Sequence, residues 1–343
     1  MRVAIIGMGR AGRARLRDLQ AAPEHAVVHT VAVRDGPAAI DAALGDNGVD
    51  AVVICAANDL HAQLVRDALA AGRHVLCEFP LAADATTTQA LFLAAAAARR
   101  VLHVELVGVL TTTHQGWQRA FAAQAPARVI CRFQGGLYRW TADESQAGRY
   151  GQLAIGRLHQ LWDLAGPLTL GSAVLTRVLG PNADDGYRID VQLRGARYGG
   201  VDVTLVEARA PSLVRGLTLS AFDAQGAAMS PAANAPAPAA TTGTDGAAPP
   251  ADAPSKERLF ARDFEVFAAR VDDAERANGR GSYVDRGGYV DRGGYVDRGG
   301  YVDDATIVAV AKLADAISGA ISAAVPVADV DAAPGAAAAS TAR

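Results

Sequence analysis

A glycine-rich turn between an apolar run and a helix-like stretch constrains this chain more than any other feature. The run Val3–Ile6 ends at Gly7, and the segment Gly7-Met-Gly-Arg-Ala-Gly12 opens the stretch Ala11–Gln20. In such a strand–turn–helix unit the first glycine makes the turn, the second lets a pyrophosphate approach, and the third lets helix and strand pack closely. A glycine-rich turn of another doubly wound fold is the alternative. We predict that a dinucleotide binds at Gly7, Met8, Gly9, Arg10 and Gly12.

The first hundred residues alternate between short apolar runs and helix-like stretches. Each predicted strand is a short apolar run: Val3–Ile6, Val27–Val33, Ala51–Cys55, His74–Cys77 and Val101–Val104. Each predicted helix lies between two of these runs: Ala11–Gln20, Leu60–Ala71 and Ala85–Ala98. Strands that alternate with helices imply right-handed crossovers and a parallel sheet. We therefore predict an α/β Rossmann domain, doubly wound around a mostly parallel sheet, over residues 1–106.

The pattern changes after about residue 107 to an alternation of apolar and polar residues. The alternation is strict over 188–194 and recurs in parts of 201–208 and 217–222. This alternation indicates strands with one solvent-exposed face, which is typical of an antiparallel sheet. Helices are predicted before and after these strands, at about 152–165 and 305–323. We predict an α+β domain with an open antiparallel sheet over residues 107–325.

Three segments have the composition of additions to this framework. Residues 226–254 are rich in Ala, Pro, Thr and Gly, lack aromatic residues and are predicted to be a disordered loop. Residues 283–300 are three copies of Tyr-Val-Asp-Arg-Gly-Gly. The repeats could form a binding array, but we favour a tandem duplication in a surface loop, because loop length costs little free energy. Residues 326–343 are predicted to be a disordered tail.

Bulk composition narrows the possible partners and compartment. The net charge of −3 gives no electrostatic footprint for nucleic acid. The three cysteines are far apart in sequence and form no C-x-x-C pair. We therefore expect neither a disulfide framework nor a zinc site, and we expect a reducing compartment. The apolar runs at the N-terminus and at 90–98 are too short for a signal peptide and a membrane span, respectively. We expect a cytoplasmic protein with no metal and leave its oligomeric state open.

Residues at the ends of the predicted strands extend the cofactor site, because ligands of open α/β sheets bind at the carboxyl ends of the strands. After the second strand, Asp35 would favour NAD through the ribose hydroxyls, and Arg34 would favour NADP through a 2′-phosphate. Each is also an ordinary solvated turn residue, so the cofactor is NAD(H) or NADP(H). The third and fourth strands contribute Ala56, Ala57, Asn58, His61, Glu78, Phe79 and Pro80. For His61, a capping or surface role is an equal alternative.

At these positions the chain resembles a known family. The segment 77–81, Cys-Glu-Phe-Pro-Leu, is similar to the C-E-K-P-L segment of the glucose–fructose oxidoreductase/inositol dehydrogenase (Gfo/Idh/MocA) family. The biliverdin reductase branch of this family is the one that the chain resembles most in four segments: 9–19, 74–81, 101–105 and 155–166. The resemblance to this branch covers about residues 1–222 and 257–324. The resemblance implies NAD(P)H-dependent reduction of biliverdin to bilirubin, with the hydride added to the central methine carbon.

Departures from the wider family bear on the chemistry. Alcohol-oxidising members use the Lys of C-E-K-P with an Asp and a His four residues apart, but this chain has Phe79, Ile155 and only His159. Oxidation of an alcohol also requires removal of its hydroxyl proton, for which Phe and Ile cannot serve. Biliverdin reductases usually have Tyr where Phe79 stands, and Phe keeps an aromatic face for stacking.

Three residues are candidates for catalysis. Arg157 lies beside an apolar stripe of its helix, which by spacing alone favours a side chain that extends to water. The resemblance instead implies that Arg157 lies at the tetrapyrrole, as a donor that orients water and stabilises developing negative charge. Glu105 ends the fifth strand and is either a site residue or a carboxylate that caps a loop. His159 would transfer protons if the chain were another small-molecule dehydrogenase or imine reductase.

Two further expectations concern the substrate and a third function. Arg132, Arg139 and Arg149 are candidates to bind the two propionates of biliverdin, although each is also an ordinary surface residue. Loss of the family's Lys and Asp also fits a non-catalytic sensor that keeps the dinucleotide site. Turnover of biliverdin distinguishes these functions.

Overall fold

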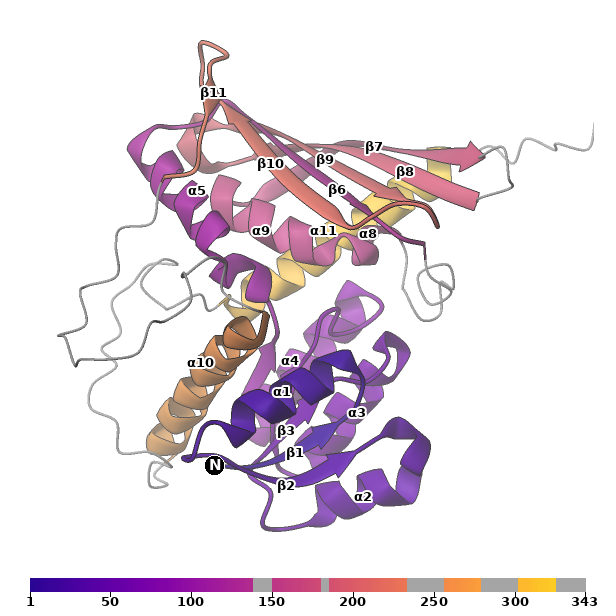
Figure 1. The fold of residues 1–343 in the computed structure, drawn as a ribbon, viewed down its shortest axis with the longest axis vertical. Helices are drawn as coiled ribbons and strands as arrows, with labels where there is room; N and C mark the ends of the chain where they lie inside the picture. The colour runs from indigo at the N-terminus through magenta and orange to yellow at the C-terminus, as the bar shows by residue number, and fades with distance from the viewer. Residues whose placement is uncertain (138–149, 180–184, 233–255, 279–301, 325–343) are drawn as a thin grey trace, which may run out of the picture.

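The computed structural model describes residues 1–137, 150–179, 185–232, 256–278 and 302–324, which form two domains stacked on each other (Figure 1). Each domain is built on its own sheet. Helices lie on the face of the second sheet that is turned toward the first domain. The repeats at 283–300, the tail at 326–343, Arg139, Arg149 and most of the loop at 226–254 lie outside the described residues.

The first domain is the predicted Rossmann arrangement. Its five parallel strands, in the order β2-β1-β3-β4-β5, are β1 (Arg2–Ile6), β2 (Ala26–Val31), β3 (Ala51–Ile54), β4 (His74–Cys77) and β5 (Leu102–Val104). Its helices are α1 (Arg10–Gln20), α2 (Pro37–Gly45), α3 (Asn58–Ala70) and α4 (Ala85–Ala98). Every residue of β3 and β4 is buried, which explains their continuous apolar runs. Helix α2 was not predicted, because it buries only Ala43 and Leu44 and so has no long apolar stripe.

The second sheet is mixed. In the order β11-β10-β6-β9-β8-β7, its six strands are β6 (Arg128–Gly135), β7 (Leu168–Leu179), β8 (Asp185–Gly195), β9 (Val201–Arg209), β10 (Gly216–Phe222) and β11 (Ala228–Met229). The neighbours are antiparallel, as predicted, except β6 and β9, which run parallel. The physical reason is that β6 connects to β7 through helices, and a helical crossover returns the chain in the same direction. Strand β11 lies inside the segment 226–254 that was predicted to be a disordered loop, so the predicted start at residue 226 is wrong.

Among the described residues, the helices of the second domain that cover one face of this sheet are α5 (Thr112–Ala123), α8 (Tyr150–Leu153), α9 (Ile155–Ala165) and α11 (Asp304–Ala324) (Figure 1). The helix predicted at 152–165 is interrupted at Ala154, between α8 and α9. Among the described helices, α11 is the one that is long and apolar enough to cross a membrane, over Asp304–Ser322. Its residues Val310, Ala314 and Ile317 belong to the core beneath the sheet, as in a core helix of a globular domain.

Helix α10 (Lys256–Ala277) follows the second sheet in sequence but packs beside α1 of the first domain (Figure 1). Its Phe264, Phe267 and Val271 join the core that contains β1 and β3. This helix was not predicted. The domain boundary at residue 106 stays a prediction, and the structure adds that a distant segment completes the first domain.

Candidate active site

The glycine turn between β1 and α1 has the geometry that a bound pyrophosphate requires. Gly7 has φ +100°, and a Cβ on it would overlap the backbone of Cys55. A Cβ on Gly12 would overlap the carbonyl oxygen of Gly7, so helix and strand are in direct backbone contact. Gly9 caps α1 with no side-chain bond and has no atom within 4 Å of its Cβ position. Open space therefore lies at the helix N-terminus, where phosphates bind.

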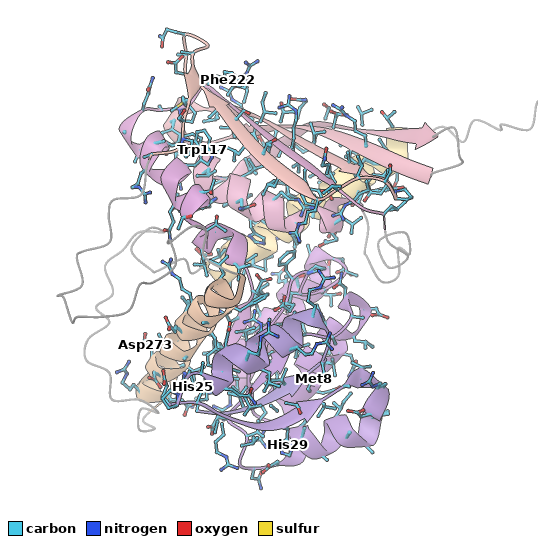
Figure 2. The ribbon with its side chains drawn as sticks, in the orientation of Figure 1. Met8, His25, His29, Trp117, Phe222 and Asp273 are labelled. Atoms are coloured by element: carbon cyan, nitrogen blue, oxygen red, sulfur yellow. The ribbon has the colours of Figure 1, made fainter. Side chains whose placement is uncertain are left out.

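Met8 of the turn, and Arg34 and Asp35 after β2, are the next predicted cofactor residues. Met8, labelled in Figure 2, is partly buried against the core of the first domain. Arg34 and Asp35 are exposed at the end of β2, next to Gly7, whose N–H donates to the Val31 carbonyl at 2.8 Å. One carboxylate oxygen of Asp35 accepts the Ala32 N–H at 2.8 Å. Direct contact of these residues with a cofactor stays a prediction.

His61 has a structural position. It is fully buried, with Nδ1 2.7 Å from the Pro80 carbonyl oxygen and Nε2 3.1 Å from the Ala56 carbonyl oxygen. The ring thus joins the start of α3 to the cis Phe79–Pro80 segment after β4. His61 does not line the cavity described below, which favours the capping role over direct contact with a cofactor.

A cavity of about 790 Å³ lies between the two domains. Its first-domain wall is formed by α1, by Asn58 (which directly follows Ala57, the N-cap of α3), and by Glu78, Phe79 and Pro80 after β4. Its second-domain wall comes from α8, α9, β6 and β9. The volume is that of a site for a small molecule or cofactor. The edge of the predicted cofactor site therefore opens into a space of ligand size.

Arg157 lines the second-domain wall and is held there by a buried carboxylate. Its Nη2 lies 2.6 Å from Oε2 of Glu207 and also donates to the Leu153 carbonyl. Arg209 donates from Nε and Nη2 to Oε1 of the same carboxylate, at 2.9 and 2.8 Å. Glu207 is 1% exposed, so two cations share one buried anion and the cluster carries a net positive charge. The guanidinium of Arg157 is thus fixed in the cavity wall rather than extended to water.

Phe133 of β6 lies beneath this cluster. Its ring centroid is 4.4 Å from the guanidinium carbon of Arg157, 4.6 Å from that of Arg209 and 6.0 Å from that of Arg215. Cations stacked on an aromatic face are attracted by its quadrupole. Phe133 and the three arginines therefore form one continuous cationic and aromatic surface in the cavity.

Sequence reasoning missed Glu207, Arg209 and Arg215 and chose Arg132 instead. Arg132 is exposed and neighbours the buried Phe133 on β6, so it projects from the other face of the sheet, away from the cavity. A usable signal was present in β9, whose inward positions are the apolar 201, 203 and 205 and then the charged 207 and 209. Charged residues on the inward phase of a strand indicate paired or functional groups.

Glu105 does not line the cavity. It is 1% exposed and accepts the Val107 N–H at 2.8 Å, at the start of the 3₁₀ turn η2 (Val107–Leu110). Burial, with the negative charge of Glu78, raises the pKa of the Glu105 carboxyl well above its ordinary value. The structure favours the loop-capping alternative, and a catalytic role for Glu105 stays a prediction.

His159 is also separated from the cavity. It is 1% exposed on α9, two residues from Arg157, and does not line the cavity wall. Burial lowers its pKa to about 3, and its Nδ1 has no hydrogen-bond partner among the described residues. A ring outside the cavity is out of reach of a substrate proton there, and the lowered pKa makes it a weak base. The structure thus argues against the proton-transfer role.

The remaining lining is poor in acid–base groups. Of the described residues that line the cavity, Glu78 is the one carboxylate, and none is His, Lys or Tyr. Glu78 itself accepts from Arg15 Nε at 2.8 Å. Phe79 packs on α9, where a Cβ on Gly156 would lie 3.1 Å from the ring. The described wall suits a reaction that needs cationic donors and flat apolar surfaces rather than a general base.

Comparison with known proteins identifies the first domain as a dinucleotide-binding domain. Residues 1–106 match the family described as "Oxidoreductase family, NAD-binding Rossmann fold" (GFO_IDH_MocA). The N-terminal domain belongs to the Gfo/Idh/MocA oxidoreductase family. Biliverdin reductase A of Mus musculus is 29% identical over 234 residues, or 64% of this chain and 74% of the mouse protein. Biliverdin reductase A of Homo sapiens is 31% identical over 187 residues, or 50% and 61% of the two chains.

Solved structures share the fold of this chain across both domains. Biliverdin reductase of Synechocystis sp. PCC 6803, in complex with biliverdin and NADP+, superposes with a TM-score of 0.64 at 18% identity, over 94% of this chain and 99% of that one. Scyllo-inositol dehydrogenase of Lactobacillus casei, with NAD(H) and scyllo-inositol, superposes with a TM-score of 0.64 at 14% identity, over 94% and 97%. The protein is an NAD(P)H-dependent oxidoreductase that uses NAD(H) or NADP(H). Because a tetrapyrrole enzyme and a polyol enzyme share this fold, the fold does not select the substrate.

Proposed function

We propose that this protein reduces biliverdin to bilirubin with NADPH or NADH, with hydride added to the central methine carbon. The observation that carries the proposal is the cationic and aromatic wall formed by Arg157, Arg209 and Phe133 around the buried Glu207. The mouse and human biliverdin reductases are relatives over much of the chain, which supports the same substrate.

The residues of the wall suit reduction of a flat conjugated substrate. The nicotinamide of the bound cofactor supplies the hydride. As negative charge develops on the tetrapyrrole, a fixed guanidinium at Arg157 stabilises it, since a preorganised donor needs no reorganisation during the reaction. An arginine has a pKa too high to act as an acid, so the proton for the pyrrole nitrogen comes from water oriented beside Arg157. Phe79 offers an aromatic face against which the tetrapyrrole stacks, and Phe133 supports the guanidinium groups of Arg157 and Arg209 from below.

Polyol oxidation is the competing activity, and the cavity gives it little support. That reaction requires a base within hydrogen-bond reach of the hydroxyl proton. His159, the candidate from sequence, is buried outside the cavity, and Glu78 is already paired with Arg15. A non-catalytic sensor would bind the cofactor without turnover of either substrate class.

The deciding experiment is an absorbance assay with purified protein, NADPH and biliverdin. The proposal predicts loss of biliverdin absorbance, gain of bilirubin absorbance and oxidation of one NADPH per bilirubin formed. A parallel assay with NAD+ or NADP+ and a panel of polyols tests the competing activity. NAD(P)+ reduction by a polyol without biliverdin turnover would replace the proposal, and cofactor binding without turnover of either class would indicate the sensor.

A further inference from the structure

Two buried polar atoms in the cavity wall of the second domain have no hydrogen-bond partner among the described residues. They are Oε1 of Gln152, which accepts hydrogen bonds, and Nε of Arg157, which donates them. Both residues line the cavity, and both are buried, at 2% and 8% exposed. A buried polar group without a partner costs free energy, so a native protein rarely keeps one that nothing completes. The two atoms therefore indicate that a ligand completes this part of the wall.

The amide of Gln152 is held in one orientation by a neighbouring carboxylate. Its Nε2 donates to Oδ1 of Asp315 on α11 at 3.2 Å. The other oxygen of Asp315 accepts the Ala85 N–H at the start of α4, at 2.8 Å, so the first domain fixes this carboxylate in turn. Because an ionised carboxylate only accepts hydrogen bonds, the amide cannot turn its oxygen toward Asp315. Oε1 is thus the atom of the amide that is left for a ligand.

The guanidinium of Arg157 lies next to the same segment of the wall. Its Nη2 donates to the carbonyl of Leu153, the residue that follows Gln152, and to the buried carboxylate of Glu207. These contacts hold the guanidinium but leave its Nε–H without a partner. The segment therefore offers a ligand one acceptor and one donor, each on a side chain that other contacts hold in place.

The central part of biliverdin carries the complementary pair of groups. Its two inner rings flank the methine carbon to which the hydride is added. One inner ring has a pyrrole N–H, which donates, and the nitrogen of the other inner ring has no hydrogen and accepts. After reduction both nitrogens carry hydrogen, so bilirubin offers two donors. A wall with one acceptor and one donor therefore matches the substrate and not the product.

We propose that Gln152 is a specificity-determining residue, whose Oε1 accepts the pyrrole N–H of one inner ring of biliverdin. The Nε–H of Arg157 faces the bare nitrogen of the other inner ring, which gains the proton in the proposed reaction. The methine carbon between the two rings is then placed by hydrogen bonds on both sides. The inference rests on the proposed function, and it names the contact by which that site recognises its substrate.

The test compares biliverdin with an analogue that is methylated at the inner pyrrole nitrogen and so has no N–H there. Three proteins are needed: the parent, Gln152→Met and the control Gln160→Met. Methionine has a similar length and volume to glutamine but no strong acceptor. Gln160 donates a comparable hydrogen bond, from Nε2 to the Gly108 carbonyl at 2.9 Å, but does not line the cavity. Steady-state kinetics with NADPH gives kcat/KM for both tetrapyrroles.

The parent should prefer biliverdin over the analogue by about tenfold or more in kcat/KM, because a site built to bind an N–H is left with an unpaired group by a ligand that lacks it. In Gln152→Met, kcat/KM for biliverdin should fall about tenfold, mainly through KM, and the preference should shrink to about twofold or less. Gln160→Met should keep the parent's preference. A merely structural role of Gln152 would lower kcat/KM for both tetrapyrroles equally and leave the preference unchanged.

The carboxamide of the cofactor is a second source of an N–H for Oε1. The dissociation constant for NADPH, measured by fluorescence, distinguishes the two sources and should be the same in all three proteins. Weaker binding of NADPH by Gln152→Met, with the preference between the tetrapyrroles unchanged, would assign Gln152 to the cofactor and overturn the proposal. The preference is a ratio measured on one protein sample, so a lower folded fraction of a variant does not alter it.

The two proposals fail in different ways. Turnover of biliverdin by a parent that shows no preference over the analogue, or a preference that Gln152→Met keeps, overturns the role of Gln152 and leaves the function in place. Absence of both binding and turnover of biliverdin in the parent, measured by its absorbance change, overturns both.

Discussion

The two walls of the cavity are built by different physical means. The first-domain wall depends on backbone: Gly7 and Gly12 have no room for a side chain, and Gly9 leaves open space at the start of α1. The second-domain wall depends on side chains, because Glu207 holds Arg157 and Arg209 by short ion pairs in a buried position. Ligand binding at the first-domain wall should therefore be lost when a side chain is added to a glycine. The function of the second-domain wall should be lost when an arginine side chain is removed.

This difference separates cofactor binding from turnover. A backbone cradle binds a phosphate through N–H groups that no substitution on the opposite wall changes. A guanidinium held at a fixed place contributes to the transition state more than to cofactor binding. Substitutions on the two walls should therefore produce two distinct kinetic signatures.

The largest effect is expected from Gly9→Val. Its branched side chain would fill the open space where the pyrophosphate binds, so affinity for NADH and NADPH should be lost while the fold survives. Calorimetric titration with both cofactors measures this. Gly45→Val is the matched control, since Gly45 also has no atom within 4 Å of its Cβ position but lies on α2, away from the cavity. Unchanged affinity in Gly9→Val would contradict the cofactor site.

Arg157→Ala tests the opposite wall. With biliverdin and NADPH, kcat should fall about 10²–10³-fold, the effect of losing one preorganised donor. Affinity for NADPH should stay at the parent's value, and Glu207 keeps Arg209 as its partner, so the fold should survive. Arg188→Ala, which removes an exposed side chain of β8, is a control for the loss of an arginine. Full activity of Arg157→Ala would remove Arg157 from the mechanism.

A third substitution tests whether a buried arginine outside the cavity acts on stability instead. Arg15→Ala leaves Asp263 and Glu78 without their shared cation in a buried place, so it should lower the free energy of unfolding by about 3–5 kcal/mol. Urea unfolding of Arg15→Ala and of Arg157→Ala, side by side, measures the contrast. Equal stability of Arg15→Ala and the parent would mean that water or a rearrangement compensates the two carboxylates.

The fold was predictable where local pattern and final burial agree. The strands of the first sheet are apolar runs because both faces are covered, and the alternation of β8 and β9 reflects one covered face. Helix α10 was missed although Phe264, Phe267 and Val271 have helical spacing. It also carries many charged residues, of which Asp263 and Glu275 are buried in contact with Arg15 and His74. Sequence does not show which charges will meet partners more than 200 residues away.

The candidate site also contains one part that is local in sequence and one part that is not. The glycine turn is local, since three glycines within six residues define it, and sequence was enough to predict it. The arginine wall is assembled from Phe133, Arg157 and Glu207, on three elements that only the sheet order brings together. Arg132 differs from Phe133 by one position, and that single step places it on the other face of β6.

His159 gives the sharpest contrast with Arg157, because both residues belong to α9 but only Arg157 lines the cavity. We expect His159→Leu to change kcat and KM for biliverdin by less than about twofold, the expectation for a residue that touches neither ligand. A large loss of kcat with a normal melting temperature would restore the proton-transfer role and weaken the case for biliverdin.

Burial of His159 also makes the stability of the fold depend on pH. Burial lowers the pKa of His159 to about 3 in the folded protein, so the ring is neutral there while the unfolded chain binds a proton below its ordinary pKa of 6.5. The unfolded state then binds more protons, and stability that is fully present above pH 6.5 is lost as the pH falls toward 3. In His159→Leu this loss is absent, so across that window the parent's free energy of unfolding should fall faster than the variant's, by up to about 1.4 kcal/mol per pH unit. Urea unfolding at a series of pH values measures both slopes, and the subtraction removes the contributions of the other histidines. Parallel slopes would mean that His159 is accessible to protons in the folded state, which would also reopen its place beside the substrate.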